Sequence, residues 1–214
     1  YENTIAGVKP HTAPVVLERR YGDCKDKSVL LMMLARAVGI EAHFALVRTR
    51  KKGPVLRDVP YQQFDHAVVY VPIQPGIEAD RFVDPTADGL DLSVLRPDVA
   101  GTLSLGYDPV ADSHTWREVP YQPAEAHQIT MTLALQVSED GSAKGLLRAQ
   151  GTGGQVIQIR KLAKNPAQAD TALRALAGKL LPTAQVERIH FRQVTALDAP
   201  VMIELDVAFD EVFA

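Results

Sequence analysis

The chain has 214 residues, of which 46% are hydrophobic and 23% are charged, and its formal net charge is −3 at pH 7. This composition is typical of a folded globular protein and argues against disorder. The slightly negative charge gives no reason to expect a nucleic-acid partner, and no apolar run is long enough to span a bilayer. One cysteine is present, which excludes an intramolecular disulfide. Because the chain begins with Tyr1 rather than Met, we expect it to be a piece of a longer protein.

The first elements are helical. Residues 1–22 read as an approach segment with a short helix in "APVVLERR". Asp23 is a suitable N-cap for the next helix, and Asp26 stands where a capping box places its second acidic residue. The pattern predicts a helix from Cys24 to Val38, ended by Gly39. Its apolar residues fall on most of its sides, so we expect it to be buried.

Strands follow this helix. The segments "EAHFALVRT" at 41–49, "FDHAVVYV" at 64–71 and "RFVD" at 81–84 are β-branched and aromatic, and they predict an antiparallel sheet. The basic stretch "RTRKKG" at 48–53 reads as a solvated loop. Residues 85–126 are rich in loop-forming residues, and a loop of that length in a compact domain is usually functional or a linker.

The pattern changes near residue 121. Residues 127–154 predict a hairpin turned at "EDG", and its first arm, with apolar residues alternating from Ile129 to Val137, predicts a half-buried strand. Residues 155–181 predict two helices broken near Asn165-Pro166, and two closing strands follow. The sequence thus predicts an α+β core over residues 1–120, with a buried helix on an antiparallel sheet, and a smaller β-dominated domain over 121–214.

Cys24 is the first candidate for chemistry. Helix N-termini carry unpaired N–H groups and the positive end of the helix dipole, and both favour the reactive thiolate over the thiol. Lys25 and Lys27 would add to this effect, while Asp23 and Asp26 would oppose it. The same backbone amides could hold an oxyanion on an attacked carbonyl. A small residue at a helix start is the competing structural explanation.

His66 and Asp84 make the catalytic interpretation stronger. An imidazole can take the thiol proton and later return it to a leaving amine. If the strands at 64–71 and 81–84 pair, the Asp84 carboxylate could orient the imidazole from the side away from the thiol. Taken singly, His66 could be a packed strand residue and Asp84 a turn residue. A zinc site on Cys24, His66 and Asp84 is the other alternative, but the spacing is unlike a small zinc module and no fourth ligand is evident.

Three segments together resemble a known family. "YGDCKDKSVLLMMLARAVGIEA", "FDHAVVYV" and "RFVDPTAD" resemble the transglutaminase-like superfamily of papain-type cysteine enzymes, in particular a bacterial branch in which "GDCKDK" opens the catalytic helix. The resemblance implies that Cys24 is the nucleophile, His66 the general base and acid, and Asp84 the orienting carboxylate. It also implies a papain-like core, a trailing β-rich domain, and a leading β-rich domain that this chain does not include.

The implied chemistry is acyl transfer from an amide through a thioester. With water as the acceptor the protein would be a protease or amidase, which we favour; with an amine it would be a protein cross-linker. A module that binds peptide or cell-envelope partners without turnover is the third possibility. The resemblance further implies a protein or peptide substrate and an exported or membrane-associated bacterial protein.

The remaining expectations concern the oxyanion, cofactors and the other histidines. Papain-like enzymes use a glutamine to help hold the oxyanion, but none lies between Tyr1 and Cys24, so we assign that role to Tyr21 or to the Cys24 backbone N–H. We expect no cofactor, because "GTGG" at 151–154 lacks the Lys-Ser/Thr of a P-loop and the spacing of a dinucleotide fingerprint and reads as a flexible turn. We also expect no metal; "DPTADGLDLS" at 84–93 has spaced carboxylates but not the EF-hand pattern for calcium. Nothing indicates the oligomeric state. The remaining histidines are interpreted as surface or packing residues: His11, His43, His114, His127 and His190.

Overall fold

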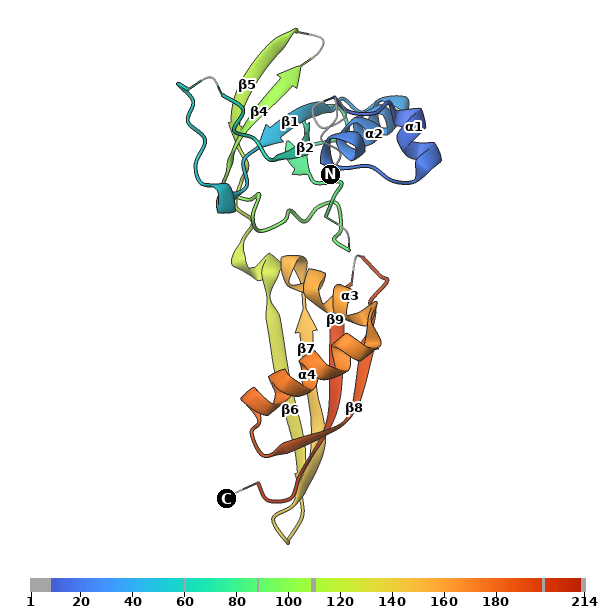
Figure 1. The fold of residues 1–214 in the computed structure, drawn as a ribbon, viewed down its shortest axis with the longest axis vertical. Coiled ribbons are helices and arrows are strands. Elements are labelled where there is room, and N and C mark those ends of the chain that lie inside the picture. The colour runs from blue at the N-terminus through green and yellow to red at the C-terminus, as the bar shows by residue number, and fades with distance from the viewer. Residues whose placement is uncertain (1–8, 60, 88, 109–110, 198, 213–214) are drawn as a thin grey trace. The chain divides into compact units, whose positions relative to one another are not determined.

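A computed structural model describes residues 9–212 except 60, 88, 109–110 and 198, so the first eight residues of the expected approach segment lie outside the described part. The chain divides into two compact units, one of Tyr1–Asp88 with Leu92–Gln122 and one of Gly89–Asp91 with Pro123–Ala214. In each unit, helices pack against an antiparallel sheet (Figure 1). The predicted α+β class is therefore confirmed.

Two helices open the first unit, α1 (Ala13–Arg19) and α2 (Cys24–Ala37). The Asp23 side chain accepts hydrogen bonds from the backbone N–H groups of Lys25 and Asp26, and the Asp26 carboxylate accepts from the Asp23 N–H. This is the capping box that the sequence predicted. Gly39, with a φ of +79°, follows the helix in the left-handed conformation that glycine tolerates, so the predicted stop is also confirmed.

The expectation that α2 is buried on most sides was wrong. One side packs against the sheet through Leu31, Met32 and Ala35. The opposite side is open among the described residues, because a helix lying on one face of a sheet buries only one stripe. The exposed residues of that side are Met33 (51% exposed), Leu34 (52%) and Val38 (72%).

The sheet of the first unit has the strand order β3-β2-β1-β4-β5, and every neighbouring pair is antiparallel. The pairing of β2 with β3, on which the placement of Asp84 depended, is present. The basic stretch forms an exposed 3-10 turn, η2 (Arg50–Lys52), as expected. The strands are β1 (His43–Val47), β2 (His66–Val71), β3 (Arg81–Val83), β4 (Leu103–Asp108) and β5 (Ser113–Glu118).

The interpretation of residues 85–126 as one long loop was too broad. Its second half contains β4 and β5, which extend the sheet beyond β1. These strands alternate poorly because β4 includes Gly106 and β5 is a polar edge strand, "SHTWRE". The irregular part is shorter and lies on the sheet: Leu95 and Val99 pack in one cluster with Val68.

The two faces of this sheet are covered differently. On one face, α2 packs over Val69, Val71 and their neighbours. On the other face, which carries Val68 and Tyr70, the irregular segment takes the place of a helix. Since side chains alternate along a strand, His66 belongs to this second face. The irregular segment therefore encloses the sheet face that carries the imidazole.

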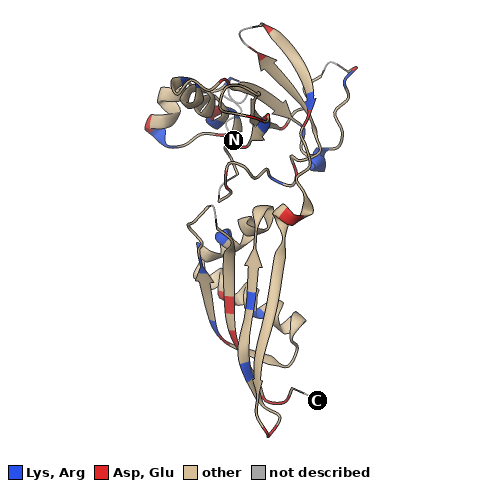
Figure 2. Ribbon diagram, turned by 180° about the vertical axis from the view of Figure 1, so that it is seen from behind, with Lys and Arg blue, Asp and Glu red and all other residues tan. Residues whose placement is uncertain are grey.

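The second unit has the sheet order β6-β7-β9-β8, again antiparallel throughout. Two helices, α3 and α4, lie over one of its faces (Figure 1), and Figure 2 shows the other face from behind without a covering helix. The predicted hairpin, helix pair and closing strands are all present. The elements are η3 (Ala124–His127), β6 (Ile129–Val137), β7 (Ala143–Gly151), η4 (Gly153–Gln155), α3 (Val156–Ala163), α4 (Pro166–Leu180), β8 (Ala184–Arg192) and β9 (Val201–Phe209).

The prediction that the strand from Ile129 to Val137 is half-buried was wrong. In β6 only Leu135 is partly buried and the other residues are exposed. The cause is its position: β6 is an edge strand, whereas the central strand β9 has its odd-numbered residues, all apolar, buried.

Candidate active site

Cys24 is the first residue of α2 and is partly buried. The glycine two residues before it is required by close packing. A Cβ at Gly22 would lie 2.8 Å from Cβ of Asp26 and 3.1 Å from Cγ1 of Val16, and the first distance is shorter than such contacts tolerate. The chain can therefore enter α2 this tightly only without a side chain at position 22.

Asp26 anchors the start of this helix. Its side chain is buried, and its carboxylate accepts from the His11 backbone N–H at 2.8 Å and lies 3.1 Å from His11 Nδ1. These contacts join the segment before α1 to the first turn of α2. His11, interpreted from sequence as a surface or packing residue, thus takes part in a specific clamp. The "GDCKDK" motif therefore supplies the thiol and also, through Asp26, fixes the start of the helix that carries it.

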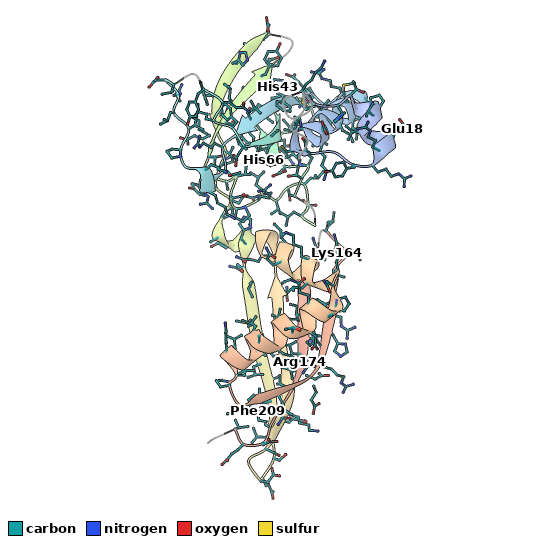
Figure 3. The ribbon with its side chains drawn as sticks, in the orientation of Figure 1. Glu18, His43, His66, Lys164, Arg174 and Phe209 are labelled. Atoms are coloured by element: carbon teal, nitrogen blue, oxygen red, sulfur yellow. The ribbon has the colours of Figure 1, made fainter. Side chains whose placement is uncertain are left out.

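His66 begins β2 and is paired with Asp84, which follows β3; Figure 3 labels His66. His66 Nε2 lies 2.8 Å from Asp84 Oδ2, and the two side chains are only 6% and 0% exposed. Because Nε2 faces the carboxylate, Nδ1 is the nitrogen left for the thiol. Cys24 and His66 lie close enough for each to shift the pKa of the other. The structure therefore places His66 beside both Cys24 and Asp84, and the catalytic roles of the three residues stay a prediction.

This arrangement shifts the pKa values of Cys24 and His66. Burial alone would raise the pKa of Cys24, but the hydrogen bond and charge of His66 and a hydrogen bond from the Ala67 backbone N–H bring it below the ordinary thiol value. Burial alone would lower the pKa of His66, but its hydrogen bonds to Asp84 and Cys24 and the charge of Asp84 raise it to about 9. Both shifts favour the charged form of the pair, with a thiolate on Cys24 and an imidazolium on His66.

The charged neighbours of Cys24 in the sequence contribute less than its partners in space. The Lys25 ammonium is paired with the Asp23 carboxylate and is buried beside it. The charge of Asp23 raises the pKa of the thiol. This effect is outweighed by His66 and Ala67 of β2, which lower the pKa of the thiol.

Asp84 is held by further groups that sequence reasoning missed. Its Oδ1 accepts from the Thr86 N–H at 2.9 Å and from the Thr86 hydroxyl at 2.6 Å. Arg96 Nη1 lies 3.9 Å from Asp84 Oδ2, and Asp98 holds the same guanidinium through bonds of 3.0 and 2.6 Å. Although burial would raise the pKa of Asp84, its bond to His66 keeps it below the usual range.

Of these helpers, only Thr86 left a signal in the sequence. An Asp whose carboxylate caps the backbone two residues on is a common turn device, and "DPT" fits it. Nothing in the spacing of Arg96 indicates a place beside Asp84, because the irregular segment determines where its side chain reaches.

A second acidic residue fixes the start of β2. The Asp65 carboxylate accepts from the Thr49 N–H and the Thr49 hydroxyl, both at 2.7 Å, and the Asp65 N–H donates to the Val47 carbonyl at 3.2 Å. These bonds tie the residue before His66 to the end of β1. The position of the imidazole along β2 is thereby set by its neighbour as well as by the strand.

The comparison with family models bears on this geometry. A model described as the transglutaminase-like superfamily matches residues 1–125, more than half of the chain. The chain belongs to the transglutaminase-like superfamily. Comparisons with curated proteins and with solved structures found no match. Membership supports cysteine-dependent acyl transfer in general, and the superfamily has enzymatic and inactive members. None of the described helices is long and apolar enough to cross a membrane.

The first turn of α2 in this transglutaminase-like core has one backbone N–H to offer an oxyanion. The amides of Lys25 and Asp26 donate to the Asp23 carboxylate, and that of Lys27 donates to the Asp23 carbonyl. Among the described residues, none accepts from the Cys24 N–H. Tyr21, the other candidate, is 79% exposed and stands before the helix. The assignment of either group to the oxyanion stays a prediction.

Metal ligation by the triad does not fit the arrangement. His66 Nε2 already bonds the Asp84 carboxylate at 2.8 Å, so these two side chains satisfy each other without an ion. The transglutaminase-like unit has another group of donors, Glu41, His43 and Asp108, whose ligand atoms lie within 4.8 Å of one another. His43 Nε2 and Glu41 Oε1 are 2.7 Å apart and already bond to each other, so we assign no ion to this group.

Proposed function

We propose that this protein is a cysteine-dependent hydrolase that cleaves peptide or amide bonds through a thioester intermediate, with Cys24, His66 and Asp84 as its triad. The observation that carries the proposal is the buried His66–Asp84 pair, 2.8 Å apart, with Cys24 close enough to His66 for the imidazole to lower the pKa of the thiol. A thiolate beside an imidazolium is the ground state that such enzymes require. The proposal is supported by the way the first residue of α2, the first residue of β2 and the residue after β3 lie close together.

In the first half-reaction, the Cys24 thiolate attacks the amide carbonyl carbon and a C–S bond forms. The resulting oxyanion accepts a hydrogen bond from the Cys24 N–H at the start of α2. The His66 imidazolium gives its proton to the departing amine as the C–N bond breaks, which leaves a thioester and a neutral imidazole. The Asp84 carboxylate keeps the ring oriented throughout.

In the second half-reaction, neutral His66 takes a proton from water while the water oxygen attacks the thioester carbonyl. The C–S bond then breaks, the acyl group leaves as a carboxylic acid, and the thiolate–imidazolium pair returns. An amine in place of water would give a cross-link by the same steps. Our preference for water, and for an exported bacterial protein, rests on the family resemblance.

The test is a trapped acyl-enzyme. The protein is mixed with p-nitrophenyl acetate, and acylation is followed by a burst of nitrophenol and by mass spectrometry of the peptide containing Cys24. We expect one acetyl group on Cys24 in the wild type and none in Cys24→Ala. A wild type that acquires no acetyl group on Cys24 would overturn the proposal.

A second assay separates the acceptors. A glutamine-containing peptide is supplied with and without a fluorescent primary amine. Release of ammonia or of a new peptide N-terminus without incorporation of the amine supports hydrolysis. Incorporation of the amine into the peptide in preference to hydrolysis would instead identify a cross-linking enzyme.

A further inference from the structure

The edge strand β6 lacks the protection that sheet edges usually carry. It has nine residues, "ITMTLALQV", with no charged residue and no proline, and of the described strands only β7 pairs with it. Edge strands are normally blunted by charges, prolines, bulges or short length, because their free N–H and C=O groups can pair with another chain. An edge this long and uncharged is a pairing surface.

The other sheet edges of the molecule differ from β6. At the opposite edge of the same sheet, β8 has a bulge between Val186 and Arg188 and carries the charged residues Glu187, Arg188 and Arg192. In the first unit, one edge strand, β3, has only three residues, and the other, β5, carries Arg117 and Glu118. The lack of protection is therefore particular to β6.

The side chains of β6 also expose an apolar face. The register places Leu133 beside Leu147 of β7, and Leu147 beside Leu205 of β9. Because Leu205 is buried on the helix-covered face, the odd-numbered residues of β6 lie on that same face. Those that are exposed are Ile129 (51%), Met131 (53%), Leu133 (38%) and Val137 (51%).

The charges of the sheet stop before this edge. On the uncovered face, Arg148 of β7 bonds Glu204 of β9, which also bonds Arg192 of β8. On β6 the same face carries Thr130, Thr132, Ala134 and Gln136. In Figure 2, β6 is tan along its whole length, while its neighbours carry blue and red segments. A partner strand at this edge therefore meets no charge on either face of β6.

We propose that two copies of this chain associate through antiparallel pairing of β6 with β6. β6 is uncharged on both faces and apolar on one, so the best partner is a strand with the same pattern. β6 of a second copy of the chain is such a strand. Charged peptides would lose hydration at this edge without gaining an opposite charge. The twofold arrangement uses one surface on both copies, which is the commonest interface in homo-oligomers.

The pattern also specifies the register. Pairing along all nine residues places Leu133 on the twofold axis, with Ile129 opposite the partner's Val137 and Met131 opposite the partner's Leu135. Apolar residues then lie opposite apolar residues between the two strands, so the apolar faces of the two copies join into one surface. A slip of one residue would place the apolar set of one copy opposite the polar set of the other.

The test uses the register. In this arrangement Thr132 lies opposite the partner's Ala134, on the uncovered face. The variant Thr132→Lys/Ala134→Lys puts lysines opposite each other twice, and the matched variant Thr132→Lys/Ala134→Glu puts lysine opposite glutamate twice. We expect the wild-type chain to dimerise in analytical ultracentrifugation, and the first variant to bind about tenfold more weakly than the second.

A wild-type chain that is monomeric up to its solubility limit would overturn the proposal, as would a dimer with the same dissociation constant in both variants. Circular dichroism checks that both variants fold. If they do not, amide hydrogen exchange of the wild type decides: protection of β6 must rise with protein concentration, while that of β8 must not. This inference does not depend on the proposed catalytic activity.

Discussion

The Asp84 carboxylate bonds His66 with one oxygen, at 2.8 Å, and Thr86 with the other, at 2.6 and 2.9 Å. Each oxygen thus has a separate task, one toward the imidazole and one toward the loop that follows β3. The carboxylate cannot turn away from the ring without losing the bonds to Thr86. This explains how a residue after a strand of only three residues can hold an imidazole in a fixed orientation.

The variant Asp84→Asn tests the effect of this carboxylate on His66. The hydrogen bond and charge of Asp84 help raise the pKa of His66 to about 9, against burial and Arg96, which lower it. With the charge removed, the alkaline limb of kcat/KM should move from near pH 9 to a lower pH. We expect kcat/KM to fall about 10³-fold to 10⁴-fold, the scale seen when a histidine base loses its carboxylate.

Thr86→Val is the matched control for Asp84. It removes the hydroxyl bond but keeps the carboxylate, so the alkaline limb should stay near pH 9 and kcat/KM should fall much less. An alkaline limb that does not move in Asp84→Asn would count against the assigned role of the carboxylate.

Alkylation of Cys24 by iodoacetamide reports the thiolate directly. Although burial would raise the pKa of Cys24, contact with His66 brings it below its ordinary value of 9.0, so the alkylation rate should rise with pH around a midpoint below 9.0. His66→Ala removes the hydrogen bond and the positive charge, so the rate profile should shift toward higher pH. The rate is measured by mass spectrometry of the one cysteine-containing peptide. Equal profiles for wild type and His66→Ala would show that the imidazole does not activate the thiol.

The local parts of this site could be predicted from the sequence. Asp23 and Asp26 indicate the start of α2 because a capping box depends on two residues that are three apart in the chain. Asp84 could be placed near His66 because two consecutive strands usually pair, and β2 and β3 do so. These predictions needed only short-range rules and one pairing.

Features that depend on distant packing could not be predicted in the same way. The exposed side of α2 was missed because apolar residues in a sequence show only which side chains can be buried. They do not show whether another element of the fold packs against them. The same holds for β6, whose alternation matches a half-buried strand although all of its residues except Leu135 are exposed. Arg96 reaches Asp84 only through the path of an irregular segment, which no periodicity describes.

The clamp between Asp26 and His11 should contribute to stability in a pH-dependent way. Asp26→Asn weakens three hydrogen bonds at a buried site, and we expect a loss of about 1–3 kcal/mol at pH 7. Burial would raise the pKa of Asp26, but the bonds from His11 and Asp23 lower it below its ordinary value of 3.8. The stabilisation is therefore complete above that pH and is lost as the pH falls through the lowered pKa.

Urea unfolding can be followed by the fluorescence of Trp116, the one tryptophan of the chain, which lies in β5 of the same unit. The difference in the free energy of unfolding between wild type and Asp26→Asn should become smaller at acid pH. Asp170→Asn is the control: its pair with Arg174 is about half exposed, so the change should stay within about 0.5 kcal/mol. A difference that is constant with pH would argue that Asp26 acts by packing alone.

Ser28 offers a test of how α2 is seated on the sheet. Its side chain is 0% exposed, and its hydroxyl has no hydrogen-bond partner among the described residues. A buried hydroxyl without a partner costs free energy, so Ser28→Ala should be neutral or should raise the free energy of unfolding by up to about 1 kcal/mol. Ser28→Val adds volume at a site with no space and should lower it by about 1–3 kcal/mol. Because Ser28 lies one turn after Cys24, the valine should also slow alkylation of the thiol, whereas the alanine should leave it unchanged. A marked loss of stability in Ser28→Ala would mean that the hydroxyl has a bonding partner and that α2 sits differently against its surroundings.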